Sequence, residues 1–389
     1  MALFGFGKTI APTERPTVTA PTPTVAAGPR GAFAPAEDLL RLVVEENASD
    51  LHLSVASPPC VRIHGRLLKL DTRALFPEDM EKLATEVATP DQIRRAKEEG
   101  SVDFAMTFKE RNRFRVSLYL QKGSLALAMR LIPRKMMSLP EIGLPPAVHE
   151  LLKLPRGLIL MTGPTGSGKT TSLAAMLDVI NRTAGAHIIT IEDPIEYIHE
   201  HQAGMIHQRE IGADVPAFAE GLRRALRQDP DVILVDEMRD LETMETAITA
   251  AETGHLVFST LHTTGAGRTV DRIVDALPAH QQEQIRVQLS TNLKAVISQL
   301  LLPRVDRPGR IAVFEVMINT HSVGALIRDN KTFRIASEIQ TGAKYGMVSL
   351  EASLVDLYLA GVISRDEVFG KAQDPEMAAQ LLGGREPRR

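Results

Sequence analysis

Apolar residues follow two different periods along this chain, and the change between them divides it. Leu39, Leu40, Val43 and Val44 form the stripe of an amphipathic helix, and 50–55 alternates polar and apolar residues like a half-buried strand. Helices and strands mixed in this way are typical of a small α+β domain. We predict further helices at 79–87 and 91–99, a strand with its turn at 61–68, and strands at 104–108, 113–120 and 124–131.

From Gly157 onward, short apolar runs alternate with helical segments. The runs predict strands at 158–161, 187–191, 231–236 and 256–260. Strands separated by helices favour a mainly parallel sheet, so the second half is predicted to be an α/β domain. Beyond Thr269 the pattern is mostly helical, with a short strand at 311–317.

Residues 11–35 are rich in Pro, Thr, Ala and Gly. Such a segment cannot bury enough apolar surface to fold, which predicts a disordered linker. We therefore divide the chain into an extension at 1–35, an α+β domain at 36–135 and an α/β domain at 136–389. The last part of the α/β domain, from about 270 to 389, is predicted to be mostly helical.

One motif connects the first strand of the α/β domain to the helix after it. Residues 163–170 match the full phosphate-binding pattern G-x-x-x-x-G-K-[ST]. Backbone N–H groups of such a loop, and the helix N-terminus that follows, bind phosphate oxygens. Lys169 would reach the β- and γ-phosphates of ATP, and the Thr170 hydroxyl would hold Mg²⁺. The predicted nucleotide-binding residues are Gly163, Pro164, Thr165, Gly166, Ser167, Gly168, Lys169, Thr170 and Thr171.

Carboxylates follow two other predicted strands. We expect Asp236 to contact the Mg²⁺ shell and Glu237, beside it, to act as the general base toward water. Glu192 and Asp193 follow the strand at 187–191 and could reach the metal and its waters. The alternative for both groups is a solvated acidic turn, which the phosphate loop earlier in the chain disfavours.

His255 and His262 bracket the strand at 256–260. A neutral imidazole can sense a γ-phosphate or orient water, and a strand ending beside a phosphate loop is a suitable place for one. Lone histidines are more often packed or exposed than catalytic, so both interpretations stay open.

Composition narrows the classes of function. The net charge over 389 residues is −3 and 4% of the residues are aromatic, which disfavours a nucleic-acid motor because it would need basic surface and stacking platforms. A single cysteine, Cys60, excludes an internal disulfide framework and a multi-cysteine zinc site. No apolar run approaches the length of a membrane span. We expect a cytosolic protein that binds no nucleic acid, does not insert into the membrane and reaches it only through partners.

Together these motifs resemble the secretion and pilus motor ATPases, and among them the type IV pilus retraction branch associated with twitching motility. Four boxes of that family occur in order: the Walker A loop at 163–170, an aspartate box at 190–197, a Walker B segment at 231–240 and a histidine box at 254–263. The boxes are specific in combination, and the similarity extends over most of the chain.

The resemblance implies a RecA-like ATPase core, preceded by a PAS-like domain and assembled into a homohexamer. It implies that Arg115 and Arg130 act as arginine fingers on the neighbouring subunit's nucleotide; without it, both read as surface strand residues. The implied activity is Mg²⁺-dependent ATP hydrolysis that drives pilus retraction. The implied partners are an inner-membrane pilus platform protein and a paralogous pilus ATPase, which would place the protein at the cytoplasmic face of that membrane.

The chain departs from the family pattern in places. It lacks the four-cysteine zinc site of the extension branch, which favours retraction, and Asp236 stands where the family commonly has glycine. The segment 325–331 keeps only Ile327 and Arg328 of an Ala-Ile-Arg-Ala-Gly pattern, which leaves an accessory retraction paralogue open. A nucleotide-gated scaffold is a further alternative, disfavoured by the presence of both Asp236 and Glu237. A pilus-extension or secretion ATPase is favoured less.

Overall fold

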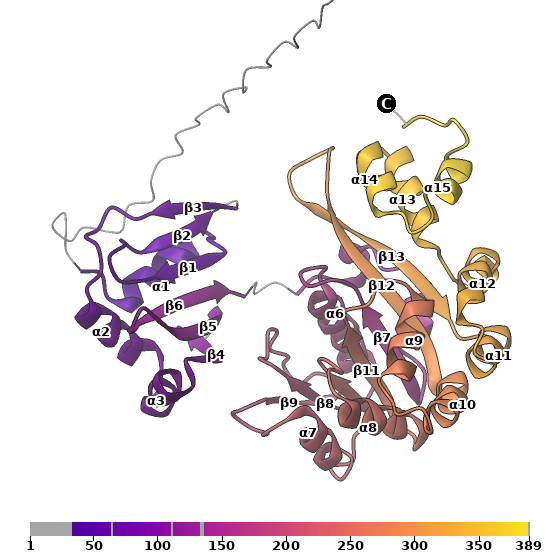
Figure 1. The fold of residues 1–389 in the computed structure, drawn as a ribbon, viewed down its shortest axis with the longest axis horizontal. Helices are drawn as coiled ribbons and strands as arrows, with labels where there is room; N and C mark the ends of the chain where they lie inside the picture. Colours follow the sequence, from indigo (N-terminus) through magenta and orange to yellow (C-terminus); the bar gives the residue numbers. More distant parts are fainter. Residues whose placement is uncertain (1–32, 64, 110–111, 133–135, 388–389) are drawn as a thin grey trace, which may run out of the picture. The chain divides into compact units, whose positions relative to one another are not determined.

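The computed structural model describes residues 33–63, 65–109, 112–132 and 136–387. These fall into two compact units, one ending at Ile132 and the other following it (Figure 1). Residues 1–32, which make up most of the predicted extension, lie outside the described residues.

The first unit is an antiparallel sheet of order β3-β2-β1-β6-β5-β4, packed against helices. α1 buries Leu39 and Val43, and β5 buries Phe114 and Val116, while Arg115 between them faces solvent because side chains alternate along a strand. The predicted α+β class is confirmed. The elements are α1 (Ala36–Glu45), β1 (Asp50–Leu53), β2 (Cys60–Ile63), β3 (Arg66–Lys69), α2 (Pro77–Val87), α3 (Pro90–Glu99), β4 (Ser101–Phe108), β5 (Asn112–Gln121) and β6 (Ser124–Leu131).

The second unit is built on a seven-stranded sheet of order β13-β12-β7-β11-β10-β8-β9. Neighbours from β12 to β9 run parallel, and β13 runs antiparallel beside β12. This is the predicted mainly parallel α/β sheet. The strands are β7 (Gly157–Thr162), β8 (His187–Glu192), β9 (Met205–Glu210), β10 (Val232–Val235), β11 (Leu256–Leu261), β12 (Leu293–Pro303) and β13 (Arg310–Ile318).

Helices cover both faces of this sheet, which is why its central strands are apolar on both sides (Figure 1). One face packs on α4 (Leu139–Ile142), α5 (Ala147–Leu151) and α6 (Lys169–Thr183). The other packs on α7 (Phe218–Ala225), α8 (Leu241–Glu252), α9 (Ala266–Asp275), α10 (Gln282–Asn292), α11 (His321–Arg328) and α12 (Ile335–Thr341). A separate cluster joins β12 and β13 to α13 (Leu350–Leu359), α14 (Arg365–Lys371) and α15 (Pro375–Leu382).

Two strands correct the sequence interpretation. Leu293–Pro303, in the stretch expected to be helical, is β12, a full member of the sheet. It follows α10 directly, with no Gly or Pro between them, so the pattern does not mark the change from helix to strand. β9 escaped prediction because Ile206 is its only fully buried residue, as expected for an edge strand.

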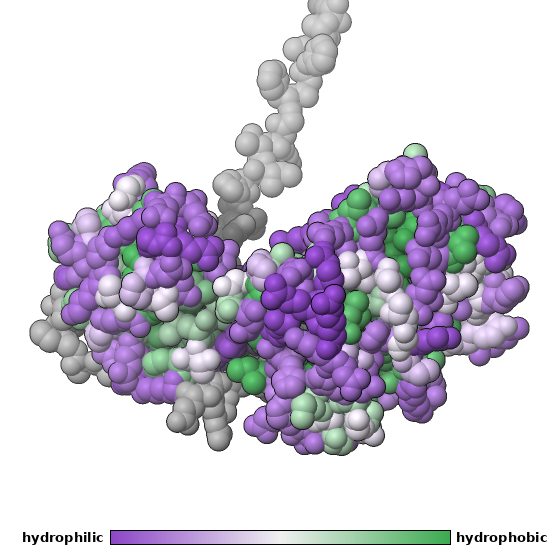
Figure 2. Space-filling model, turned by 90° about the horizontal axis from the view of Figure 1, so that it is seen from below, coloured by the Kyte–Doolittle hydropathy of each residue, from purple (hydrophilic) through white to green (hydrophobic). Residues whose placement is uncertain are grey.

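The visible surface of each unit is mainly hydrophilic, with hydrophobic residues in separate small patches (Figure 2). Within the described ranges, no helix is both long and apolar enough to span a bilayer.

Candidate nucleotide-binding and hydrolysis site

The candidate site lies where four parallel strands of the second unit end. β7 leads into the phosphate loop, β8 ends at Glu192, β10 ends one residue before Asp236, and β11 ends one residue before His262. These strands are neighbours in the order β7-β11-β10-β8. Their carboxyl ends therefore meet at one edge, where open α/β sheets bind their ligands.

Glycines set the shape of the phosphate loop. Gly163, Gly166 and Gly168 have φ angles of 142°, 78° and 92°, which residues with a Cβ rarely adopt. At Gly163 a Cβ would also lie 2.2 Å from the backbone oxygen of Gln299 on β12. Gly168 leads directly into α6, which begins at Lys169 and directs its free N–H groups toward the loop.

Two side chains of the loop indicate that it fits a phosphate group. The Nζ of the buried Lys169 donates to the carbonyl oxygens of Gly163 at 2.8 Å and Pro164 at 3.2 Å. Burial lowers the pKa of Lys169, although the nearby Glu237 and Asp236 oppose this. Within the described part of the chain, the buried Ser167 hydroxyl has no hydrogen-bond partner. A phosphate oxygen would supply one, because backbone N–H groups of such a loop converge on an anion.

Glu192 and Asp236 form an acidic pair at the ends of β8 and β10. Burial raises the pKa of Glu192, whose Oε1 accepts hydrogen bonds from Thr190 at 2.6 Å and Gln208 at 3.0 Å. Removal from water, with the adjoining Glu192 and Glu196 carboxylates, raises the pKa of Asp236 to about 7. A divalent cation beside the pair would favour the ionised forms, so these side chains fit the Mg²⁺ of a nucleotide.

The remaining predicted ligands lie around this pair. No group of three or more His, Cys, Asp or Glu side chains among the described residues could hold a metal by itself. Nucleotide-bound Mg²⁺ needs no such cage, because substrate phosphates and waters complete its shell. Thr170 lies in the first turn of α6, and the Asp193 N–H is hydrogen-bonded to the Asp236 carboxylate. The Thr171 hydroxyl lies 2.9 Å from the Tyr197 hydroxyl, which links α6 to the segment after β8.

Glu237 connects two of the predicted boxes. Its Oε1 lies 2.9 Å from His262 Nε2, and its Oε2 lies 2.8 Å from an Arg239 nitrogen. His262 Nδ1 lies 3.5 Å from the hydroxyl of Thr165 in the phosphate loop. Burial favours a higher pKa, but hydrogen bonds from Arg239 and His262 outweigh it and hold the pKa of Glu237 below its ordinary value. The arrangement places the ionised Glu237 carboxylate beside His262, which in turn contacts the phosphate loop.

Comparison with known proteins decides the family. Residues 35–368 match the model of the type II/IV secretion system protein family. The chain belongs to this family. It is 44% identical over 339 residues to the type IV pilus retraction ATPase PilT of Pseudomonas aeruginosa, covering 87% of this chain and 98% of that protein. It is 38% identical to the type IV pilus ATPase PilU of the same organism, covering 86% of this chain and 88% of that protein.

A solved structure gives the same result for the fold. The crystal structure of the pilus retraction motor PilT with bound ADP matches with a TM-score of 0.84 and 44% identity, covering 89% of this chain and 99% of that chain. The predicted fold class, a secretion ATPase core after a smaller N-terminal domain, is thus confirmed.

One predicted residue of the second unit, His255, is not brought to the edge that carries the loop. His255 precedes β11, with its Nδ1 3.0 Å from the Ala250 carbonyl oxygen, so it lies roughly 15–20 Å away at the amino end of the strand. Arg115 and Arg130 lie on β5 and β6 of the first unit, paired in register and exposed. Arg130 Nε donates to Asp50 Oδ1 at 2.8 Å. Their action on a neighbouring subunit's nucleotide stays a prediction.

The structure adds three residues that the sequence interpretation missed. Arg239 lies inside the Walker B segment and Tyr197 inside the aspartate box. The sequence therefore placed both residues within the boxes, but it could not show which side chains they contact. Gln299 is 2% exposed beneath the loop. Its only signal in the sequence is a Ser-Gln pair in an otherwise apolar run.

Proposed function

We propose that this chain is a cytoplasmic motor ATPase of type IV pilus retraction. It would work as a homohexamer that couples ATP hydrolysis to twitching motility. The observation that carries the proposal is the Glu237–His262–Thr165 chain of contacts, which sets a carboxylate and an imidazole beside a complete phosphate loop. The similarity to PilT over nearly the whole of both chains supports the pilus role.

The residues of the second unit have separate parts in hydrolysis. In this reaction a water oxygen bonds to the γ-phosphorus as the bond to the bridging oxygen breaks. Lys169 neutralises charge on the phosphates. Glu237 orients the water and accepts its proton, for which a carboxylate has lone pairs beyond those used by Arg239 and His262. His262 reports the state of the phosphate loop to Glu237, because it contacts both.

Mg²⁺ would be held by Thr170 and the acidic pair, with Asp193 beside them, and would supply charge neutralisation to the phosphates. Because burial raises the pKa of Asp236 to about 7, a cation beside its carboxylate would favour the ionised form.

Arg115 and Arg130 would complete the site from the next subunit of the ring. Both guanidinium groups lie on the exposed face of the first unit's sheet. Such groups bind phosphate oxygens bidentately and stabilise transferring charge. Closure of the subunit interface on ATP, and its release after hydrolysis, would act in turn on an inner-membrane platform protein.

A deletion of the gene tests the pilus role. The expected phenotype is loss of twitching with more pili on the cell surface; loss of pili would instead indicate extension. Complementation in a strain that lacks its PilU-like paralogue separates a main motor from an accessory one. Purified protein should show a specific ATPase activity that rises with concentration as rings assemble, whereas a scaffold would show none at any concentration.

A further inference from the structure

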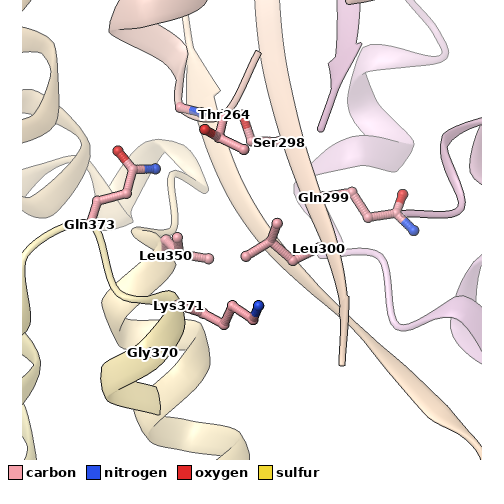
Figure 3. A pocket seen from close by; sticks show the side chains of 9 residues that line it. Thr264, Ser298, Gln299, Leu300, Leu350, Gly370, Lys371 and Gln373 are labelled. Atoms are coloured by element: carbon pink, nitrogen blue, oxygen red, sulfur yellow. Dashed lines mark hydrogen bonds between the residues drawn. The ribbon is translucent and has the colours of Figure 1, made fainter. Parts of the chain in front are cut away.

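One buried amide lies beneath the phosphate loop and belongs to none of the boxes. Gln299, on β12, is 2% exposed. Side chains alternate along the strand, and in Figure 3 Gln299 points to the side of β12 opposite Leu300. Leu300 points instead toward Leu350 and Lys371 of the C-terminal helices. The Gln299 side chain therefore lies on the side of β12 that faces the phosphate loop.

Gln299 approaches the loop at both of its ends. Its backbone oxygen lies where a Cβ on Gly163 would be only 2.2 Å away, and its Nε2 lies 2.9 Å from the position of a Cβ on Gly168. Its Oε1 accepts a hydrogen bond from the buried Ser172 hydroxyl at 2.8 Å. With the oxygen bonded to Ser172, the NH₂ group is the end of the amide that lies beside Gly168 of the loop.

The preceding residue, Ser298, contacts two segments that adjoin the loop: the end of β7 and the turn before α9. Its hydroxyl lies 2.6 Å from that of Thr162, the last residue of β7, and accepts a hydrogen bond from the Gly265 N–H at 3.1 Å. Gly265 directly precedes α9, which follows the histidine box. Two consecutive residues of β12 thus contact the loop, the strand before it and the segment after His262.

Backbone pairing with β7 and β13 holds β12 in place. The strand borders a cavity of about 190 Å³, which Leu300, Leu350, Lys371 and Gln373 line together with Ser298 and Gln299 (Figure 3). A second cavity is lined by Gly168, Ser172 and Gln299. Because the strand is fixed by its backbone pairing, the Gln299 side chain can act on the loop from a defined position.

We propose that Gln299 is a positioning residue that preorganises the phosphate loop for the nucleotide phosphates. This inference rests on the proposed function, since it concerns the same site. Its amide is held by Ser172 so that two N–H donors, which carry partial positive charge, face the loop from below. A loop already in its bound shape loses less freedom on binding, which strengthens the complex.

Two variants of equal length separate positioning from simple packing. The probe is a fluorescent N-methylanthraniloyl analogue of ADP, titrated with Mg²⁺ into the full chain. Gln299→Met removes both polar groups and should raise Kd about tenfold, because the loop must be ordered on binding. Gln299→Glu keeps the Ser172 contact but places a carboxylate under the phosphates, so Kd should rise about a hundredfold.

The thermal midpoint of the nucleotide-free protein is measured on the same samples. Ser172→Ala added to Gln299→Met should weaken binding no further, because both substitutions remove the same hydrogen bond between Ser172 and Gln299. Gln380→Leu, on the exposed surface of α15, is the control and should bind like wild type.

The inference fails if Gln299→Glu and Gln299→Met bind the analogue equally, even when both melt earlier, since that is the result of packing alone. It fails also if both bind like wild type. Failure of the wild-type chain to bind the analogue is a different result, and contradicts the proposed function.

Discussion

At the scale of single residues, the site depends on charges that the fold withdraws from water. Lys169, Glu192 and Asp236 are each shifted toward their neutral form by burial. Glu237 is the exception, because hydrogen bonds from Arg239 and His262 outweigh its burial. Binding of a nucleotide with its cation would stabilise the charged forms of the first three, while Glu237 is ionised beforehand.

Glu237→Gln should leave ATP binding within a few-fold of wild type and lower turnover at least about a hundredfold, because the amide cannot accept the proton of the attacking water. The measurements are nucleotide titration and steady-state phosphate release. The exposed Glu283→Gln is the matched control. Turnover near the wild-type rate would contradict the assignment of Glu237.

Lys169→Ala should weaken nucleotide binding about a hundredfold or more, because the ammonium is the buried cation of the phosphate loop. Lys153→Ala removes an ammonium from an exposed ion pair with Glu150 and should have no effect. Titration with the fluorescent ADP analogue distinguishes them. Equal affinities of the two variants would show that the loop binds phosphate without Lys169.

At the scale of elements, parallel strands bring distant segments of the chain to one edge, and buried carboxylates secure the helices around it. Glu315 of β13 is 8% exposed and accepts a hydrogen bond from the Ala266 N–H at the start of α9. Glu351 of α13, also buried, accepts from the N–H groups of Gln373 and Asp374 before α15. Each carboxylate therefore satisfies N–H groups beside a helix N-terminus.

Glu315 should make the stability of the second unit depend on pH. Removal from water first, and then the Glu351 carboxylate, raise the pKa of Glu315 to about 7, against an opposing hydrogen bond from Ala266. The folded state then holds a proton that the unfolded chain releases from about pH 4.5 upward. The stability that this proton contributes is complete below that pH and is lost as pH rises to about 7, by a few kcal/mol at most.

Melting curves of wild type and Glu315→Gln between pH 5 and pH 8 test this. The wild-type midpoint should fall over that range, and the amide variant should fall less because it carries no titrating group. Glu283→Gln, at an exposed position of α10, serves as the control. Parallel slopes for wild type and Glu315→Gln would remove Glu315 as the cause.

At the scale of the whole molecule, the chain carries the candidate nucleotide site in one unit and exposed arginines in the other. The arginines form part of a row across the first unit's sheet, where Asp50 pairs with Arg130 at 2.8 Å and Arg62 at 3.6 Å. Asp50 has a lowered pKa, since hydrogen bonds from Ser49 and Arg130 outweigh its burial. It is therefore a fixed negative charge that orients the row.

Mixing two inactive variants tests whether the arginines act between subunits. Lys169→Ala alone and the double variant Arg115→Ala with Arg130→Ala should each hydrolyse ATP at least tenfold more slowly than wild type. Mixed one to one, about a quarter of the interfaces of a cyclic assembly would join an intact loop to intact arginines. ATPase activity should therefore reappear on mixing.

The control replaces the arginine variant with Arg95→Ala, whose exposed ion pair with Glu99 lies on α3. Because Arg95→Ala keeps Arg115, Arg130 and an intact loop, it should be active before mixing. An inactive mixture of the two inactive variants would indicate that the arginines act within their own subunit or not at all.

The sequence by itself determined the local elements of the candidate site. These are a phosphate loop between a buried strand and a helix, carboxylate residues after two further strands, and a histidine after a fourth strand. These are local patterns, set by the period of apolar residues and by the glycines that a tight loop requires. The same local signals predicted the strands of the first unit except β3, which was taken as the turn after β2.

Only the tertiary structure decided which of these residues meet. His262 reaches Glu237 and Thr165, whereas His255, on the same strand, lies at its other end, because a strand separates its two ends by its whole length. The sequence also did not predict β12 or a role for Gln299. The role of a buried polar residue in an apolar run depends on which residue it contacts in the fold. That neighbour is more than a hundred residues away in the chain.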